Sequence, residues 1–150
     1  PPGAMATRPV IVALAGPLAV VRHRLHHIAK GRQKDWPAFF AAMHLDPVND
    51  WCHLLVRLLH REGLRIAIVS GRPDDYAMEI REWLRAHAVP FDALYLRKSG
   101  DFRPDTIVKK ELLDAHFRKE DVLFVLDDRQ SVVDMWRREG LVCLQANPHE

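Results

Sequence analysis

Two adjacent carboxylates are the clearest candidates for chemistry in this sequence. Asp127 and Asp128 directly follow the apolar run VLFVL. Two neighbouring negative charges repel each other and are costly beside an apolar strand unless a cation offsets them. Oxygen ligands of this kind suit Mg²⁺. The alternative is that one aspartate caps the following helix while the other faces water and pairs with Arg129.

A hydroxyl, a glycine and a guanidinium stand together at Ser70, Gly71 and Arg72, after a second apolar run. At the start of a helix, a phosphate would accept hydrogen bonds from Ser70, from backbone N–H groups and from Arg72. The same residues also suit a plain strand-to-helix turn in which Ser70 or Asp74 caps the helix. The tripeptide alone leaves both interpretations open.

Lys109 lies four residues after Asp105, so the two side chains share one face of a predicted helix. An ordinary surface ion pair is the simpler interpretation of this spacing. The functional interpretation is an ammonium group aimed at phosphate oxygens.

A regular framework must position these side chains. Five runs rich in Val, Ile and Leu, without strict alternation, are typical of strands covered on both faces: Pro9–Leu14, Leu64–Val69, Ala93–Leu96, Val122–Leu126 and Leu141–Gln145. Helical patterns lie between the later strands, at Asn49–Glu62, Asp74–His87, Pro104–Phe117 and Gln130–Glu139. This alternation predicts an α/β fold with a parallel sheet between helix layers and a ligand site at the carboxyl ends of the strands. The tryptophans of these helices, Trp51, Trp83 and Trp136, are predicted to pack in the core.

Residues 22–47 break this rhythm and predict a small helical insertion over the carboxyl ends of the sheet. Its aromatic residues, Trp36, Phe39 and Phe40, either cover a ligand or anchor the insertion. Its basic start contains His23 and His27 at a spacing that suits a transition metal, but no third ligand is evident nearby. A basic face that attracts an anionic substrate, or a merely solvated helix, is the better interpretation.

Length and composition limit the function classes. The 150 residues suit one domain, predicted at 9–150 after a tag remnant or disordered segment at 1–8. A net charge of +2 is too small to indicate nucleic-acid binding by itself, and no apolar run is long enough to span a bilayer. Cys52 and Cys143 lie in apolar segments, which predicts buried thiols in a reducing, cytoplasmic setting.

The order of these motifs resembles the haloacid dehalogenase (HAD) superfamily. The resemblance is greatest to the phosphatase domain of bacteriophage polynucleotide kinases and similar phage-type phosphatases, over about residues 9–147. It is carried by IVSGRPDDYAMEIREWL, GDFRPDTIVKKELL and VLDDRQSVVDMWRREGLVCLQ. The resemblance implies a Rossmannoid three-layer sandwich with a five-stranded parallel sheet, a small helical insertion after the first strand, and a phosphoric monoester hydrolase activity that depends on Mg²⁺.

The resemblance also implies roles for individual residues. Ser70 would hold the phosphate, with Gly71 and Arg72 beside it, and Arg24 falls where the subgroup has a functional arginine. Lys109 would stabilise the phosphate and the nucleophile, with Asp105 supporting it. Asp127 and Asp128 would form the acidic Mg²⁺ site.

The first motif departs from the family pattern. Where the family has Asp-x-Asp-Gly-Thr, this chain has alanine at both aspartate positions, Ala13 and Ala15, and Pro17 in place of threonine. Ala13 cannot form an aspartyl-phosphate and removes one carboxylate from the metal shell. Ala15 cannot transfer a proton, a role often worth about 10²–10⁴-fold in rate. We therefore predict no significant turnover and a weak or empty Mg²⁺ site.

Three functions follow from this departure. The first is an inactive phosphatase-fold domain that keeps an anion pocket for a nucleotide or a polynucleotide end. The second is a working Mg²⁺-dependent phosphomonoesterase that uses Asp127 or Asp128, or an inactivated mutant of such an enzyme. The third is a protein-interaction module that binds a partner through the basic residues 22–32. Paired alanines fit deliberate replacement, whereas Pro17 favours a natural pseudophosphatase.

Overall fold

Five parallel strands form one sheet in the order β3-β2-β1-β4-β5, in a computed structural model that describes residues 8–21, 25, 27–29 and 33–149. The strands are β1 Pro9–Ala13, β2 Arg65–Pro73, β3 Ala93–Arg97, β4 Phe124–Arg129 and β5 Cys143–His149. The α-helices are α2 Trp36–Ala41, α3 Asp50–Arg61, α4 Ala77–Ala86, α5 Asp105–His116 and α6 Gln130–Arg138. Short 3₁₀ turns are η2 Ala42–Leu45, η3 Asp74–Tyr76 and η4 Lys119–Asp121.

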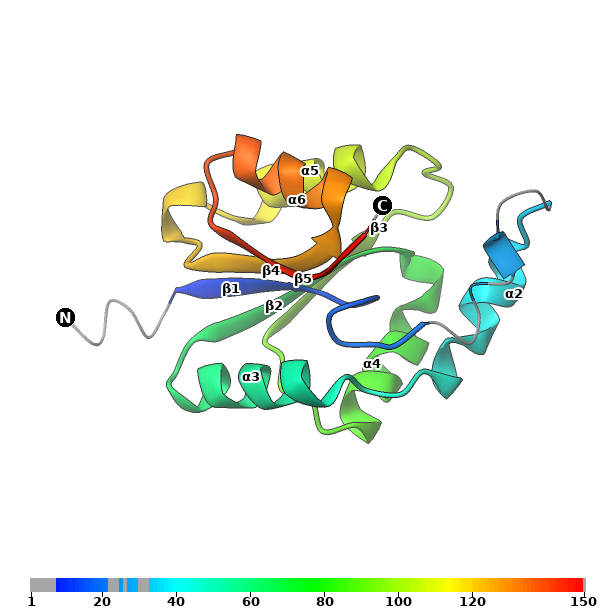
Figure 1. Ribbon diagram of the computed structural model, residues 1–150, viewed down its shortest axis with the longest axis horizontal. Coiled ribbons are helices and arrows are strands. Elements are labelled where there is room, and N and C mark those ends of the chain that lie inside the picture. The colour runs from blue at the N-terminus through cyan, green and yellow to red at the C-terminus, as the bar shows by residue number, and fades with distance from the viewer. Residues whose placement is uncertain (1–7, 22–24, 26, 30–32, 150) are drawn as a thin grey trace.

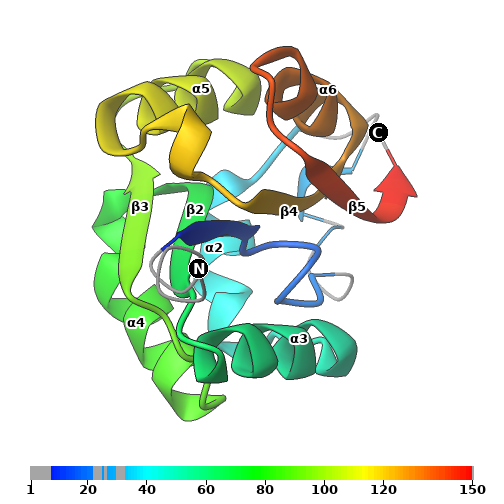
Figure 2. The same ribbon diagram turned by 90° about the vertical axis from the view of Figure 1, so that its left-hand side faces the viewer.

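The sheet lies between two helix layers, with α3 and α4 on one face and α5 and α6 on the other (Figures 1 and 2). Helix α2 lies beyond the carboxyl ends of the strands (Figure 1). This arrangement confirms the predicted α/β three-layer sandwich with a helical insertion after the first strand.

Both faces of the central strand β1 are buried, which explains its continuous apolar sequence. Successive side chains of a strand point to opposite faces. Val10 and Val12 therefore join the core under α3 and α4, whereas Ile11 joins the core under α5 and α6. The second core is built around Trp136, which is fully buried as predicted.

Two segments predicted to bind ligands lie inside strands rather than after them. Strand β2 continues through Ser70 and Arg72 to Pro73, and α4 begins only at Ala77, so the prediction that this tripeptide starts a helix was wrong. Strand β4 likewise includes Asp127 and Asp128. The pairing register shifts after Ser70 in β2 and after Asp127 in β4, so both segments bend away from their neighbours at the carboxyl edge.

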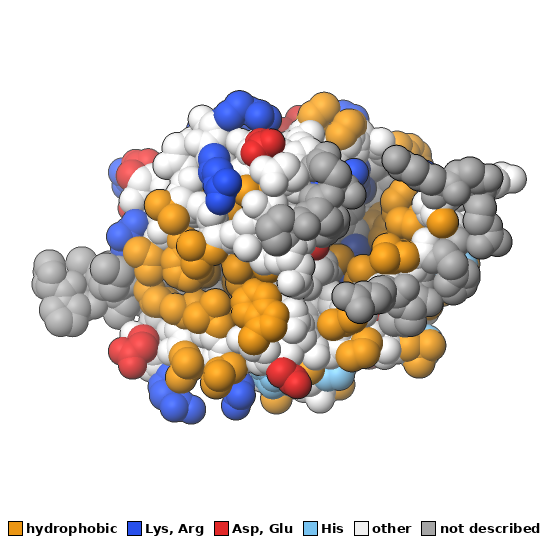
Figure 3. Space-filling model, in the orientation of Figure 1, with side chains coloured by type: hydrophobic (Ala, Val, Ile, Leu, Met, Phe, Trp, Pro, Cys, Tyr) orange, Lys and Arg blue, Asp and Glu red, His pale blue; other side chains and the backbone are white. Residues whose placement is uncertain are grey.

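Helix α3 differs from the prediction in what it buries. Its buried residues are Cys52 and Val56, whereas Trp51, Leu54 and Leu58 are 43%, 49% and 44% exposed. The prediction that Trp51 packs in the core was therefore wrong. In Figure 3, hydrophobic side chains gather on the face of the molecule over α3 and β5.

The described chain begins at Arg8, whose guanidinium donates hydrogen bonds to the carbonyl oxygens of Asp121 and Val122. The rest of the predicted N-terminal extension, residues 1–7, lies outside the described residues. Cys52 and Cys143 are buried free thiols, as predicted. Among the described helices, none has the length and apolar character needed to cross a membrane.

Candidate functional site

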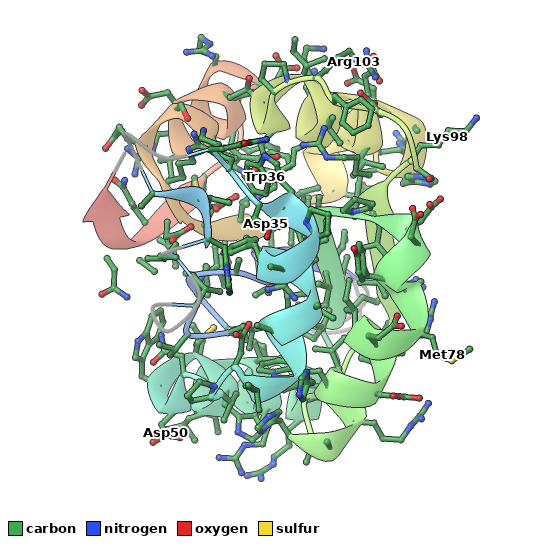
Figure 4. The ribbon with its side chains drawn as sticks, turned by 90° about the vertical axis from the view of Figure 1, so that its right-hand side faces the viewer. Asp35, Trp36, Asp50, Met78, Lys98 and Arg103 are labelled. Carbon is green, nitrogen blue, oxygen red and sulfur yellow. The ribbon has the colours of Figure 1, made fainter. Side chains whose placement is uncertain are left out.

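The carboxyl end of β1 brings the two alanines of the first motif to the centre of the site. Ala13 pairs with Val69, the residue before Ser70 in β2. On the other side, Val12 pairs with Leu126, so the next residues along β1 and β4 are Ala13 and Asp127. In Figure 4, which faces the carboxyl ends of the strands, α2 lies in front of the sheet, and Asp35 and Trp36 mark where that helix begins. The first-motif alanine Ala13 therefore lies at the carboxyl end of the central strand, between the strands that carry Ser70 and Asp127.

Asp127 and Lys109 form a buried ion pair at the core of the site. The Lys109 ammonium lies 3.0 Å from Oδ2 of Asp127, and both side chains are almost completely buried. The same oxygen accepts a hydrogen bond of 3.0 Å from the indole Nε1 of Trp136, and Oδ1 accepts one of 2.8 Å from the backbone N–H of Asp128. The Asp127 carboxylate is thus held by three donors from three parts of the chain.

The two charges stabilise each other against the cost of burial. Burial alone would lower the pKa of Lys109, but the negative charges of Asp127 and Asp105 outweigh it, so this pKa lies above its ordinary value. Burial alone would raise the pKa of Asp127, but the charge of Lys109 and the hydrogen bond from Trp136 bring it below its ordinary value. Both groups are therefore charged at neutral pH.

Asp128 occupies the space that a side chain at position 16 would need. Gly16 has a φ of +96°, and a Cβ built on it would overlap the Asp128 carboxylate. Gly16 directly follows Ala15, so Asp128 lies beside the loop that carries the second alanine. The close approach of carboxylate and backbone requires glycine at this position.

Arg72 is held by a carboxylate from the insertion. Its Nη2 lies 3.4 Å from Oδ2 of Asp46, and both side chains are buried. The backbone carbonyl of Asp46 accepts a hydrogen bond of 2.9 Å from Nε1 of Trp83, which fixes the segment after η2 against α4. Ser70 contributes locally, because its Oγ accepts a hydrogen bond of 3.1 Å from the backbone N–H of Arg72. Asp46 was not among the residues predicted for the site, because it stands before Pro47 in a segment with no motif.

Arg97 organises the loop between β3 and α5. Its guanidinium donates to the carbonyl oxygens of Gly71 at 2.6 Å, Asp101 at 3.0 Å and Arg103 at 2.6 Å, and to the carboxylate of Asp105. The side chain of Asp105 in turn lies against Gly71, where a Cβ would overlap it. No motif in the sequence indicates this role of Arg97.

The structure decides between the alternatives left open for the acidic and basic residues. Lys109 pairs with Asp127, so a surface ion pair between Lys109 and Asp105 was the wrong interpretation. The N-cap residue of α6 is Arg129, rather than either aspartate, and its side chain makes no capping hydrogen bond. Arg129 instead lies 3.9 Å from Asp105.

Several predicted positions remain without a structural account. Arg24 and His23 lie outside the described residues.

A cavity of about 620 Å³ opens at the amino ends of β1, β2 and β3, and a smaller one of about 280 Å³ lies between α2 and η3. The residues proposed to bind phosphate line neither of them.

The acidic residues present do not make a complete magnesium site. Ala13 offers no oxygen from its side chain, and Oδ2 of Asp127 already accepts hydrogen bonds from Lys109 and Trp136. In the described part of the chain, no three His, Cys, Asp or Glu side chains come together as a possible metal site. Mg²⁺ in proteins is usually held by one or two carboxylates together with water and phosphate oxygens, so each carboxylate that is missing or already hydrogen-bonded weakens the site.

Comparison with known proteins agrees with this arrangement of motifs. The protein-family model for the polynucleotide kinase PNKP phosphatase domain, a HAD-type domain, matches residues 8–150 of this chain. The chain belongs to this family. It is therefore a PNKP-type phosphatase-like domain of the HAD superfamily, a superfamily whose members generally use Mg²⁺.

Solved structures support the same assignment for this PNKP-type domain. It is 30% identical to chains in two structures of a Pnkp1/Rnl/Hen1 complex, one of them described as an RNA repair complex, with TM-scores of 0.79 and 0.81. The similarity covers 96% and 97% of this chain but only 47% and 44% of those chains. This chain thus spans less than half the length of those relatives. A haloacid dehalogenase-like hydrolase from Bacteroides fragilis shares the fold at 16% identity and a TM-score of 0.65, over 93% of this chain and 87% of that one.

Proposed function

We propose that this domain binds a phosphorylated ligand, such as a nucleotide or a polynucleotide end, and does not hydrolyse it. The observation that carries the proposal is the combination found at one edge of the sheet. Alanine stands at both positions where the resemblance implies aspartates, while Ser70, Arg72 and Lys109 are buried at the same edge of the sheet.

The chemistry of catalysis is missing rather than misplaced. An alanine methyl group has no lone pair with which to attack phosphorus, and it cannot donate a proton to the leaving oxygen. Binding needs other groups, namely cations and hydrogen-bond donors, and these remain. Because Arg72 and Lys109 already pair with Asp46 and Asp127, a bound phosphate would share these cations with the carboxylates.

Calorimetric titration with a 3′-phosphorylated oligonucleotide and with its unphosphorylated counterpart tests the binding half of the proposal. We expect heat of binding only with the phosphorylated strand. Arg72→Ala should weaken binding about tenfold to a hundredfold, the usual value of a hydrogen bond to a charged group. Ser70→Ala is a second variant that leaves the Arg72–Asp46 pair intact. Equal binding of both strands would refute a phosphate pocket.

Restoring the aspartates tests the catalytic half. The unaltered chain should release no inorganic phosphate in the presence of Mg²⁺. The double variant Ala13→Asp, Ala15→Asp should gain both metal binding and phosphate release. If the unaltered chain hydrolyses the substrate, and Asp127→Asn with Asp128→Asn abolishes that activity, the competing proposal of a working phosphomonoesterase is correct instead.

A second candidate function is a non-catalytic member of a protein assembly. It is favoured by the similarity to chains solved within a Pnkp1/Rnl/Hen1 complex. The basic residues 22–32 are the surface that the sequence suggests for such a contact. A pull-down that recovers the same partners after Arg22, Arg24 and Arg32 are changed to Glu would count against that surface.

A further inference from the structure

Helix α3 carries more apolar surface than the core of this domain covers. Its apolar residues are Trp51, Cys52, Leu54, Leu55, Val56, Leu58 and Leu59. At 3.6 residues per turn they occupy roughly 200° of the helix circumference. The half of this apolar arc that includes Cys52 and Val56 packs into the core, and both of these residues are fully buried. The other half of the apolar arc remains exposed.

The exposed half forms one strip along the helix. Trp51, Leu54 and Leu58 follow each other at spacings of three and four residues, which places them on one face. All three have between 43% and 49% of their surface exposed. Val142 and Leu144, at the edge strand β5, are exposed as well, and hydrophobic side chains continue from α3 to this edge (Figure 3). Continuous apolar surface of this kind marks an interaction site in a soluble protein.

The charges beside the strip indicate what covers it. Asp50, Arg57 and Arg61 are exposed along one border of the strip, and none of them forms an ion pair with a residue that the structure describes. The border is acidic where α3 begins and basic where it ends, and Figure 4 shows Asp50 at the beginning.

We propose that a second copy of this chain covers the strip, with the two α3 helices packed antiparallel about a two-fold axis. A two-fold axis perpendicular to both helices brings the same border of each together in opposite directions. The acidic start of one helix then faces the basic end of the other, so Asp50 of each copy meets Arg61 of the second copy. Trp51 of each copy reaches Leu58 of the other across the seam.

Analytical ultracentrifugation of the unaltered chain over a range of concentrations tests the proposal. We expect the mass to rise from 17.3 kDa toward twice that value as concentration increases. Leu54→Glu should keep the chain monomeric, because a dimer of this variant would bury two glutamate charges, one from each copy, between the helices. Met78→Glu is the matched control: Met78 is 70% exposed on α4, away from α3, and its replacement should leave the association unchanged (Figure 4).

A charge exchange tests the antiparallel geometry. Asp50→Arg alone and Arg61→Asp alone should each weaken the dimer about tenfold, because like charges then face each other at two symmetric positions. The double variant Asp50→Arg, Arg61→Asp should restore the original affinity, since the pair is re-formed with its signs exchanged.

Several outcomes would overturn the proposal. One is a chain that stays monomeric at every concentration, and another is a dimer that survives Leu54→Glu. Failure of the double charge exchange to restore affinity would exclude the antiparallel pairing. A mass increase that requires a different protein would assign the strip to that protein instead.

Discussion

At the scale of single residues, the chemistry of this site depends on which partner each charge has. Lys109 is a buried cation whose position is explained by one carboxylate, that of Asp127. That carboxylate also accepts a hydrogen bond from Trp136, so it joins α5, β4 and α6. A buried pair adds little net stability compared with apolar residues, but removing one member leaves an uncompensated charge. The pair therefore helps to hold the edge of the sheet even without catalysis.

We expect Asp127→Asn to lower the free energy of unfolding by about 3 kcal/mol, because it leaves the Lys109 ammonium buried without its counter-charge. Urea unfolding measures this change. The control is Asp114→Asn, which breaks the exposed pair of 2.8 Å between Lys110 and Asp114 on α5 and should change stability very little. Equal effects of the two variants would mean that the buried pair has no special structural role.

The lowered pKa of Asp127 also predicts how stability depends on acid. Its carboxyl group binds a proton more weakly in the folded chain than in the unfolded one, so its contribution is fully present above the ordinary value of 3.8. That contribution is lost as the pH falls from 3.8 through the lower pKa of the folded state. The free energy of unfolding, measured between pH 5 and about pH 2, should therefore fall less steeply with decreasing pH for Asp127→Asn than for the unaltered chain. The same dependence on pH in both chains would contradict the lowered pKa of Asp127.

At the level of elements, two contacts between distant parts of the chain are close enough to require glycine. Gly16, after β1, lies against Asp128 from β4, and Gly71, in β2, lies against Asp105 from α5. These contacts join elements that are far apart in the sequence. The carboxyl edge of the sheet is thus shaped by the packing of these glycines against carboxylates, in addition to the pairing of the strands.

We expect Gly16→Ala to destabilise the chain more than Gly140→Ala does. Both glycines have positive φ, +96° and +88°, so both substitutions carry a similar backbone strain of roughly 1–2 kcal/mol. Only at Gly16 would the new Cβ overlap a neighbour, the Asp128 carboxylate, whereas nothing lies within 4 Å of a Cβ at Gly140. Urea unfolding of the two variants checks the difference. Equal losses of stability would show that Asp128 moves aside without cost.

At the scale of the whole molecule, one sheet is shared by two apolar cores. Leu84 of α4 is fully buried in the core under α3 and α4, and Leu113 of α5 is fully buried in the core on the opposite face. Strand β1 contributes side chains to both cores, so the loss of this strand would disrupt both of them.

Leu84→Ala and Leu113→Ala should each lower the free energy of unfolding by about 3 kcal/mol, because each leaves a cavity in a packed core. Circular dichroism and tryptophan fluorescence should report one coincident transition for either variant. Two separate transitions in one variant would mean that the cores unfold independently. The exposed Ile107→Ala provides a comparison on α5 and should cost much less.

Hydrophobic periodicity and side-chain chemistry were enough to predict the order of strands and helices along the chain, the burial of Trp83 and Trp136, and the lack of a side-chain carboxylate at position 13. These depend on hydrophobic periodicity along the chain and on the atoms that each side chain carries. The prediction that Trp51 is buried was wrong, because an apolar helix face shows only that burial is favourable and not which element is present to cover it.

Which charged side chains meet depends on how the elements pack. Lys109 has an aspartate one turn away, Asp105, yet it pairs with Asp127 eighteen residues further on. Arg72 pairs with Asp46, and Arg97 holds Gly71 and Asp105, although no motif joins these residues. Spacing along the chain predicts contacts within one helix or strand. Contacts between elements depend on how the strands are ordered in the sheet and where each loop bends, and these are properties of the packed molecule.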